Sequence, residues 1–105
     1  MADHQISHLL RGDVAVGTEV TVKGWVRTRR DSKAGLSFIQ VHDGTCFDTI
    51  QVVAPNDLAN YTAEVQKLSA GCSVICTGEL VESQGMGQSV EIKATAIYVN
   101  AIGPE

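Results

Sequence analysis

The chain has 105 residues, with 12 acidic side chains against 8 Lys and Arg, a formal net charge of −4 and 44% apolar residues. This size and makeup predict one globular domain over residues 1–105, whose core needs no metal or disulfide support. No apolar run approaches the ~18 residues of a membrane helix, and the first residues lack the basic and apolar regions of a signal peptide. We therefore expect a cytoplasmic chain with no membrane partner.

The three cysteines cannot all pair within the chain. If Cys72 and Cys76 lie on one strand, they are ~13 Å apart, beyond the ~6 Å that a disulfide spans. We expect Cys46, Cys72 and Cys76 to be buried small hydrophobic residues.

Apolar and polar residues alternate from Glu19 onward, which predicts a long first strand. Gly24 within it indicates a bulge or a sharp bend. A turn follows at 33–35, and Asp43-Gly44 is a strong signal for a tight hairpin. Four further strands are predicted over residues 36–42, 47–54, 72–83 and 89–99.

Two helices are predicted between and before these strands. Apolar residues recur at helical spacing after the third strand, at Leu58, Tyr61, Val65 and Leu68. Asn56 or Asp57 would cap this helix and Gly71 would end it. A short N-terminal helix is expected over 6–11. Five strands with a helix between the third and fourth are the signature of an OB-fold, an all-β five-stranded Greek-key barrel that binds oligonucleotides on strands two and three.

Positive charge is concentrated in one segment. Five of the eight basic residues lie between positions 23 and 33 with one acid, Asp31, so this segment carries +4 and the remainder −8. The five are Lys23, Arg27, Arg29, Arg30 and Lys33. Basic residues also protect strand edges from pairing, but on this barrel we favour phosphate contacts for the clustered set.

No catalytic constellation is evident. His42 is far in sequence from His4 and His8, and no Ser or Cys stands in a nucleophile motif. Three carboxylates lack a second set of ligands at metal spacing, namely Asp43, Asp48 and Glu91. We expect no catalytic residue, no metal and no cofactor in this chain.

Phe38 and Gln51 are the candidate base-binding residues. A two-residue turn at either Gly44-Thr45 or Asp43-Gly44 places both on the outer face, and the first of these turns places them opposite each other. A large aromatic ring among polar groups suits base stacking. The alternative is that Phe38 closes the barrel end beside Leu36 and Val53, and the pattern does not decide. Trp25 is expected to pack structurally beside Gly24.

Glu91 alternates with Val90 and Ile92, so it points away from the core. A carboxylate at the binding face would accept hydrogen bonds from base amino or imino groups. The alternative is a surface pair with Lys23 or Arg27 across strands one and five, worth ~0–1 kcal/mol.

The sequence closely resembles the N-terminal anticodon-binding domain of bacterial asparaginyl-tRNA synthetases over about residues 14–99. Aspartyl and lysyl synthetases share this type of domain, but the insertion at 45–48 is of the asparaginyl kind. The resemblance is carried by Gly24-Trp25-Val26-Arg27-Thr28-Arg29-Arg30-Asp31-Ser32-Lys33, Leu36-Ser37-Phe38-Ile39 and Asp43-Gly44-Thr45-Cys46-Phe47-Asp48.

The resemblance implies that the chain binds the anticodon stem-loop of tRNA(Asn). Phe38 would stack on the central uridine, Gln51 would read its edge and Glu91 would contact neighbouring bases. Further loop contacts would come from Arg27, Arg29, Arg30 and, more weakly, Lys33. The chain would be a fragment of a homodimeric ligase whose absent catalytic domain uses ATP and Mg²⁺. Two other readings stay open, a general single-stranded nucleic-acid module and a protein-interaction domain using the rim near Leu36 and Val53.

Overall fold

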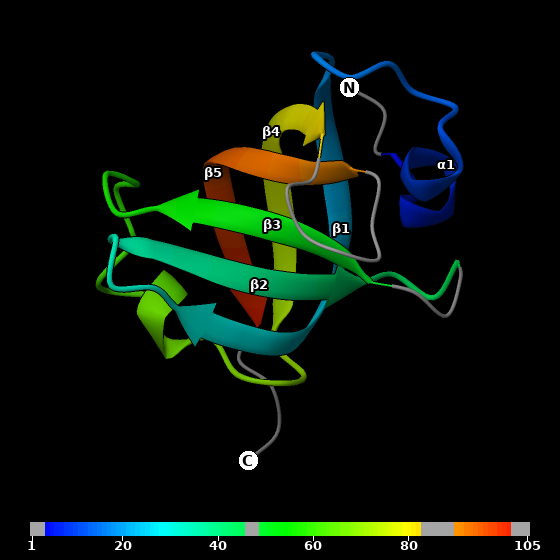
Figure 1. The fold of residues 1–105 in the computed structure, drawn as a ribbon. Helices are drawn as coiled ribbons and strands as arrows, with labels where there is room; N and C mark the ends of the chain where they lie inside the picture. Colours follow the sequence, from blue (N-terminus) through cyan, green and yellow to red (C-terminus); the bar gives the residue numbers. More distant parts are fainter. Residues whose placement is uncertain (1–3, 46–48, 83–89, 102–105) are drawn as a thin grey trace.

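The computed structural model describes residues 4–45, 49–82 and 90–101, with five strands that close into a barrel (Figure 1). The strand order around the barrel is β1-β2-β3-β5-β4, and the predicted OB-fold architecture is confirmed. The elements are α1 (Ile6–Arg11), β1 (Glu19–Asp31), β2 (Leu36–His42), β3 (Ile50–Pro55), the 3₁₀ turn η1 (Val65–Lys67), β4 (Ser73–Glu82) and β5 (Val90–Ala101).

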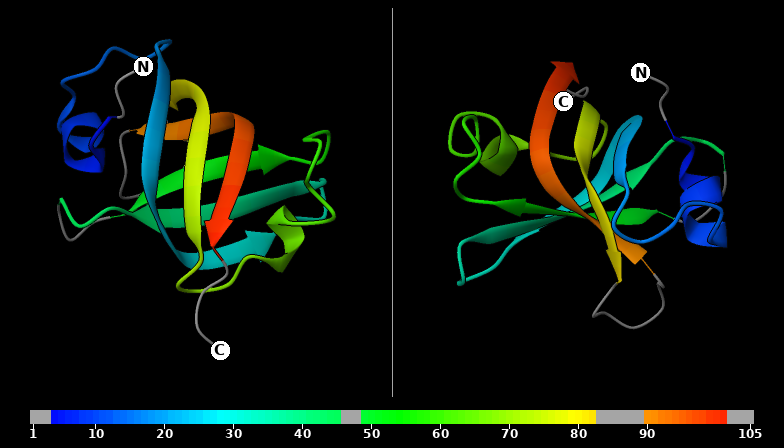
Figure 2. Two further views of the ribbon diagram at one scale, coloured as in Figure 1. Left: turned by 180° about the vertical axis from the view of Figure 1, so that it is seen from behind. Right: turned by 90° about the horizontal axis from the view of Figure 1, so that it is seen from above.

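The long strand β1 serves two neighbours. Its first half pairs with β4, as seen from behind in Figure 2, and its second half pairs with β2, the change falling at Trp25. Gly24 lies where the two strands approach closely, because a Cβ there would be 2.2 Å from the His42 carbonyl oxygen. The bulge that the sequence suggested at Gly24 lies later, between Val26 and Thr28, with Arg27 as the extra residue.

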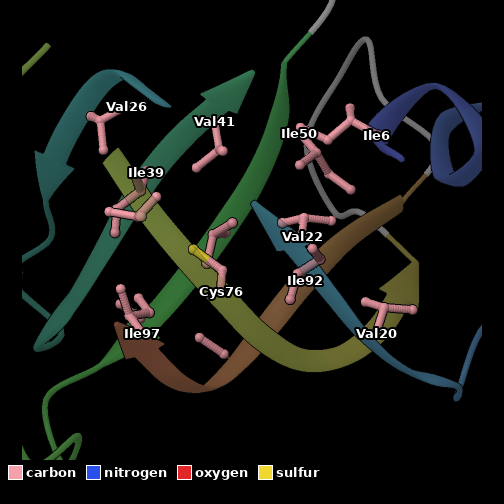
Figure 3. Packing of buried hydrophobic residues seen from close by; sticks show 14 of the residues in the cluster. Ile6, Val20, Val22, Val26, Ile39, Val41, Ile50, Cys76, Ile92 and Ile97 are labelled. Carbon is pink, nitrogen blue, oxygen red and sulfur yellow. The ribbon is translucent and has the colours of Figure 1, made fainter. Parts of the chain in front are cut away.

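The barrel interior is filled by aliphatic side chains from every strand (Figure 3). Alternation holds along β2 and β3, where Ile39, Val41, Ile50 and Val52 are all fully buried as predicted. Apolar burial of this kind is the main stabilising contribution to the fold.

Two of the cysteines belong to this core. Cys72 and Cys76 form no disulfide and are fully buried, which confirms the prediction for them, whereas Cys46 lies outside the described residues. Burial raises the pKa of the Cys76 thiol to about 12. Cys76 therefore stays a neutral, apolar group at physiological pH.

The predicted helix between β3 and β4 is wrong in its secondary structure. The segment is a series of turns with only the 3₁₀ turn η1, although Tyr61, Val65 and Leu68 are buried as a helix would have buried them. A tertiary contact ties the segment to β5, in which the Asn60 side-chain amide donates to the Ile97 carbonyl at 2.8 Å. Tertiary contacts of this kind override a helical pattern in the sequence.

The register of the β2–β3 hairpin also differs from both predicted alternatives. Gln40 pairs with Gln51 and Phe38 with Val53, so the connection is longer than a two-residue turn and β3 begins at Ile50. The shift is by an even number of residues, so Phe38 and Gln51 still share the outer face. Residues 46–48 and the predicted loop at 84–88 lie outside the described residues.

The N-terminal helix α1 forms as predicted and packs against the end of this hairpin (Figure 1). Ile6 and Leu9 are fully buried. The Ile6 N–H donates to Asp43 Oδ2 at 2.9 Å, and the Ser7 N–H donates to Thr45 Oγ1 at 3.1 Å. These two bonds satisfy backbone donors that a helix start leaves unpaired.

Candidate nucleic-acid interface

The outer face of β2 carries the side chains that the sequence singled out. Residues at even positions from Leu36 to His42 are half-buried and alternate with buried ones. Across the β1 pairing, Arg30 stands opposite Phe38 and Thr28 opposite Gln40. Because paired residues of neighbouring strands point to the same side of a sheet, these four side chains share one surface.

Phe38 and Arg30 interact directly. The Arg30 guanidinium carbon lies 5.5 Å from the centre of the Phe38 ring, within the range of a cation–π contact. Beside them the surface is hollowed over about 420 Å³, lined by Thr28, Arg30, Phe38, Gln40 and Gln51. The hollow therefore combines an aromatic ring, a guanidinium and two amides.

A chain of side-chain hydrogen bonds runs along the edge of this hollow. The Thr49 hydroxyl donates to Gln40 Oε1 at 2.7 Å, and Gln40 Nε2 donates to Gln51 Oε1 at 3.1 Å. Gln51 Nε2 in turn donates to Glu91 Oε1 at 3.3 Å. We call these four residues the amide chain. It brings together Gln51 and Glu91, which the sequence proposed separately.

The neighbours of Glu91 differ from one sequence expectation. In the barrel, β5 lies between β3 and β4 and does not border β1. A pair across strands one and five with Lys23 or Arg27 is therefore wrong, because it assumed a border between those strands. Glu91 meets Gln51 from β3 instead, through the parallel β3–β5 pairing.

The predicted basic residues do not act as one set. Arg27, Arg30 and Lys33 are exposed, whereas Arg29 faces the opposite side of β1. Arg29 Nε donates to the Leu68 carbonyl at 2.9 Å, and its Nη1 donates to Asp31 Oδ2 at 2.6 Å. Its guanidinium therefore ties the β3–β4 connector to β1.

Asp31, the last residue of β1, is the centre of a separate hydrogen-bond network. The Arg29 guanidinium and the Ser37 hydroxyl both donate to Asp31, and together they lower the pKa of its carboxyl. Ser37 is fully buried and also lies 2.9 Å from the Tyr61 hydroxyl. This network has a structural role and is separate from the hollow beside Phe38.

Trp25 extends the outer face toward the other end of β2. It was expected to pack structurally beside Gly24, but 47% of its surface is exposed and its ring lies 5.7 Å from that of His42. His42 points to the same side of β2 as Phe38 and Gln40. The face thus carries aromatic rings at both ends with polar groups between them.

One residue of the site was missed by sequence reasoning as a functional group. Gln40 is visible in the sequence only as a polar neighbour of Phe38, because its partners depend on a hairpin register that a two-residue turn does not give, whereas Thr49 was already a candidate for holding the Gln51 amide in one orientation. Among the described residues no three His, Cys, Asp or Glu side chains gather as a potential metal site, and no helix there has the length and apolar character to cross a membrane.

Comparison with known proteins places this surface in context. Residues 20–100 match the tRNA anti-codon family of OB-fold nucleic acid binding domains. The chain belongs to this family. As an OB-fold nucleic acid binding domain it is also similar to the asparagine–tRNA ligase of Shewanella amazonensis, with 62% identity over 99 residues that cover 94% of the chain. The chain spans 21% of the length of that curated relative.

Solved structures support the fold of this OB domain. The asparaginyl-tRNA synthetase of Pyrococcus horikoshii complexed with asparaginyl-adenylate superposes with a TM-score of 0.77 over 97% of the chain and 23% of that protein, at 18% identity. An OBody bound to hen egg-white lysozyme superposes equally well, at 0.77 over 97% of the chain and 96% of that protein, with 20% identity.

Proposed function

We propose that this OB domain reads the anticodon loop of tRNA(Asn) as part of an asparagine–tRNA ligase. The observation that carries the proposal is the hollow in which Phe38, Arg30 and the Gln51 amide converge on the outer face of β1–β3. An aromatic ring next to an amide is the arrangement that unstacked RNA bases require. The identity of the chain to asparagine–tRNA ligases favours tRNA(Asn) over other RNAs.

In this proposal each residue has one task. Phe38 stacks on the central uridine of the anticodon and Gln51 binds its Watson–Crick edge. Glu91 lies against Gln51 at the side of the hollow, where neighbouring bases pass. Loop phosphates are bound by Arg27, Arg30 and Lys33, while Arg29 has the structural task described above.

The arrangement of Arg30 bears on how the uridine enters. In the free domain the Arg30 guanidinium covers part of the Phe38 ring. A cation–π contact at an exposed site is worth only about 0.5–1 kcal/mol, which is less than the ~1–3 kcal/mol of a stacked base. The incoming base therefore displaces Arg30 from the ring, and the freed guanidinium turns to a phosphate.

The full-length protein would attach asparagine to tRNA(Asn) using ATP and Mg²⁺ bound in a separate catalytic domain. We also propose that it works in the cytoplasm as a homodimer formed through that domain. The OB domain would then supply tRNA recognition and no catalytic residue.

A protein-binding role is the second candidate, because OBodies of the same fold bind lysozyme. Here the acidic remainder of the chain and the exposed cations of the 23–33 segment favour RNA. Arg30 contacts the Phe38 ring, and Arg27 and Lys33 are exposed elsewhere in the same segment.

Titration of RNA hairpins distinguishes these functions. The chain is titrated with the tRNA(Asn) anticodon stem-loop, with the same stem carrying a scrambled loop, and with a single-stranded oligonucleotide of the loop sequence. We expect the matched hairpin to bind at least about tenfold more tightly than the scrambled one, since each wrong base costs ~1–3 kcal/mol. Equal affinity for all three would indicate a general single-stranded module, and no binding to any would overturn the nucleic-acid function.

A further inference from the structure

The amide chain has a direction that the structure defines. It begins at the Thr49 hydroxyl, passes through the two glutamine amides and ends at the Glu91 carboxylate. Its members come from three places in the fold: β2, β5, and β3 with the residue just before it. The four side chains are all partly buried, which strengthens hydrogen bonds relative to those in open water.

Glu91 fixes that direction. A carboxylate has no hydrogen to donate, so the group of Gln51 that faces it must be the amide nitrogen. The amide oxygen of Gln51 then faces Gln40, which must present its own nitrogen, and the oxygen of Gln40 faces the Thr49 hydroxyl. Thr49 accepts or donates equally well, so it supports the chain without choosing its direction.

The direction matters because the two orientations of an amide present different hydrogen-bond patterns, and uridine and cytidine each complement only one of them. Uridine offers an imino hydrogen beside a carbonyl oxygen, whereas cytidine offers a ring nitrogen acceptor beside an amino group. A glutamine held in one orientation complements uridine, and the flipped orientation complements cytidine. An amide nitrogen has two hydrogens and an amide oxygen two lone pairs, so one bond of each kind in the chain does not exhaust either atom.

Flipping Gln51 has a specific cost in this site. The flip places its amide oxygen against the Glu91 carboxylate, and its nitrogen against the nitrogen of Gln40. Gln40 can relieve its own clash by flipping, because Thr49 can donate or accept. The oxygen-to-oxygen contact at Glu91 cannot be relieved in this way, so the cost of binding cytidine falls on the Glu91 end of the chain.

We propose that Gln40, Thr49 and Glu91 are positioning residues that hold the Gln51 amide in the orientation that selects uridine over cytidine at the centre of the anticodon. Glu91 determines the orientation, Gln40 holds the amide in place, and Thr49 secures Gln40. This inference rests on the proposed function, because it assumes that Gln51 meets the central base. It assigns to Glu91 an action through Gln51 in addition to any base contact of its own.

The test compares two stem-loops that differ only in carrying uridine or cytidine at the middle anticodon position. The ratio of their dissociation constants is measured for the unaltered chain, Glu91→Gln and Gln40→Leu. The unaltered chain should prefer uridine by roughly five- to a hundredfold, as a complementary pair allows. Glu91→Gln should bring the ratio to within about twofold of unity, because a glutamine at this position can turn to donate and the chain can then run either way.

Matched variants separate positioning from general effects of mutation. Gln40→Leu removes both bonds and leaves an apolar side chain of similar bulk. It should reduce the ratio at least about threefold with no loss of thermal stability beyond that of a surface change. Thr49→Val should reduce the ratio less than Gln40→Leu does. Thr49→Ser keeps the hydroxyl and should show the ratio of the unaltered chain. Glu79→Gln removes a charge from an exposed site on β4 and should leave the ratio unchanged.

The outcomes of this test distinguish the positioning role from the proposed anticodon-binding function. A strong preference for uridine that survives unchanged in Glu91→Gln and Gln40→Leu would overturn the positioning role while leaving the anticodon-binding function intact. Equal binding of both loops by the unaltered chain would overturn the role of Gln51 and the inference with it. If Glu79→Gln also loses the preference for uridine, the loss in Glu91→Gln comes from the change in net charge, and the positioning role is overturned.

Discussion

Phe38 is half-buried between β1 and β3, opposite Val53 on one side and Arg30 on the other. Its position beside Val53 is what a residue closing the barrel would also show, so burial alone does not assign its function. The hollow beside the ring and the amides around it favour base stacking. The two readings differ in what removal of the ring does to binding and to stability.

Replacing Phe38 by alanine should weaken binding of the stem-loop by roughly 1–3 kcal/mol, nearly independent of the base at the centre, because every base offers a π face. The ratio between uridine and cytidine loops should stay within about twofold of that of the unaltered chain. Isothermal titration with both hairpins measures this. Tyr98→Ala, an exposed aromatic residue on β5, serves as control and should bind normally. Unchanged affinity in Phe38→Ala, with loss of stability only, would favour the barrel-closing role.

Gly24 is required by the close approach of β1 and β2. A methyl group at this position would lie 2.2 Å from the His42 carbonyl oxygen and 3.0 Å from Val41 Cγ1. Gly24→Ala should therefore lower the free energy of unfolding by about 1–3 kcal/mol, the usual cost of overpacking. Denaturant unfolding measures the change, with Glu19→Ala at the exposed start of β1 as control. A stability equal to that of the control would contradict this close contact.

At the scale of elements, the sequence predicts which face of a strand a side chain occupies better than it predicts the residues with which that side chain pairs. Period-two alternation placed Ile39 inward and Phe38 outward, and these assignments need only the parity of each strand. The pairing of Gln40 with Gln51 depends on the length of the hairpin connection, and the Gln51–Glu91 contact depends on a parallel pairing of strands about 40 residues apart. Neither contact is encoded by residues close together in sequence. The sequence could therefore identify site residues but not the hydrogen bonds between them.

The β3–β4 connector shows the same limit. Burial of Tyr61, Val65 and Leu68 satisfied a helical pattern, and the pattern correctly found the side that packs on the core. The connector is tied to β5 through Asn60, whose partner, the Ile97 carbonyl, is 37 residues away. Tertiary contacts of this kind routinely override helix propensity.

The docking of α1 should depend on pH through Asp43. Partial burial opposes ionisation of this carboxyl, but hydrogen bonds from the Ile6 N–H and from Thr45 outweigh it, so its pKa lies below the ordinary value of 3.8. A group whose pKa is lowered by folding stabilises the fold above its unfolded pKa, and this contribution is lost as the pH falls through the folded value. Acid should therefore release α1 from the hairpin.

Hydrogen exchange at the Ile6 and Ser7 amides measures this release. Their protection should hold at pH 5–7 and decline below about pH 3.8. Asp43→Asn should lower the protection already at neutral pH, since charge-assisted bonds are roughly twice as strong as neutral ones. Asp13→Asn, which alters only an exposed pair with Arg11, is the control. Full protection in Asp43→Asn at every pH would show that apolar packing of Ile6 and Leu9 alone holds the helix.

At the scale of the whole molecule, charge separates one surface from the rest. The segment 23–33, which covers the second half of β1 and the turn after it, carries +4 and the remainder −8, so RNA is attracted to this segment and repelled by the rest of the chain. This distribution limits the number of phosphates that the domain can neutralise. Under the proposed function, it would let an acidic chain bind RNA through this segment.

The salt dependence of stem-loop binding should reflect three cations. With Arg27, Arg30 and Lys33 on phosphates, the logarithm of the association constant should fall against that of salt concentration with a slope of about −2, at ~0.7 per phosphate of a single strand. Arg30→Ala should flatten the slope by just under one unit and weaken matched and scrambled loops alike, because phosphate contacts carry no sequence information. Arg29→Ala is the informative comparison, since its guanidinium is held by the Leu68 carbonyl and by Asp31. It should keep the slope and lower the thermal midpoint instead. A slope near zero, or an Arg29→Ala variant that flattens it as much as Arg30→Ala, would contradict this division of the basic segment.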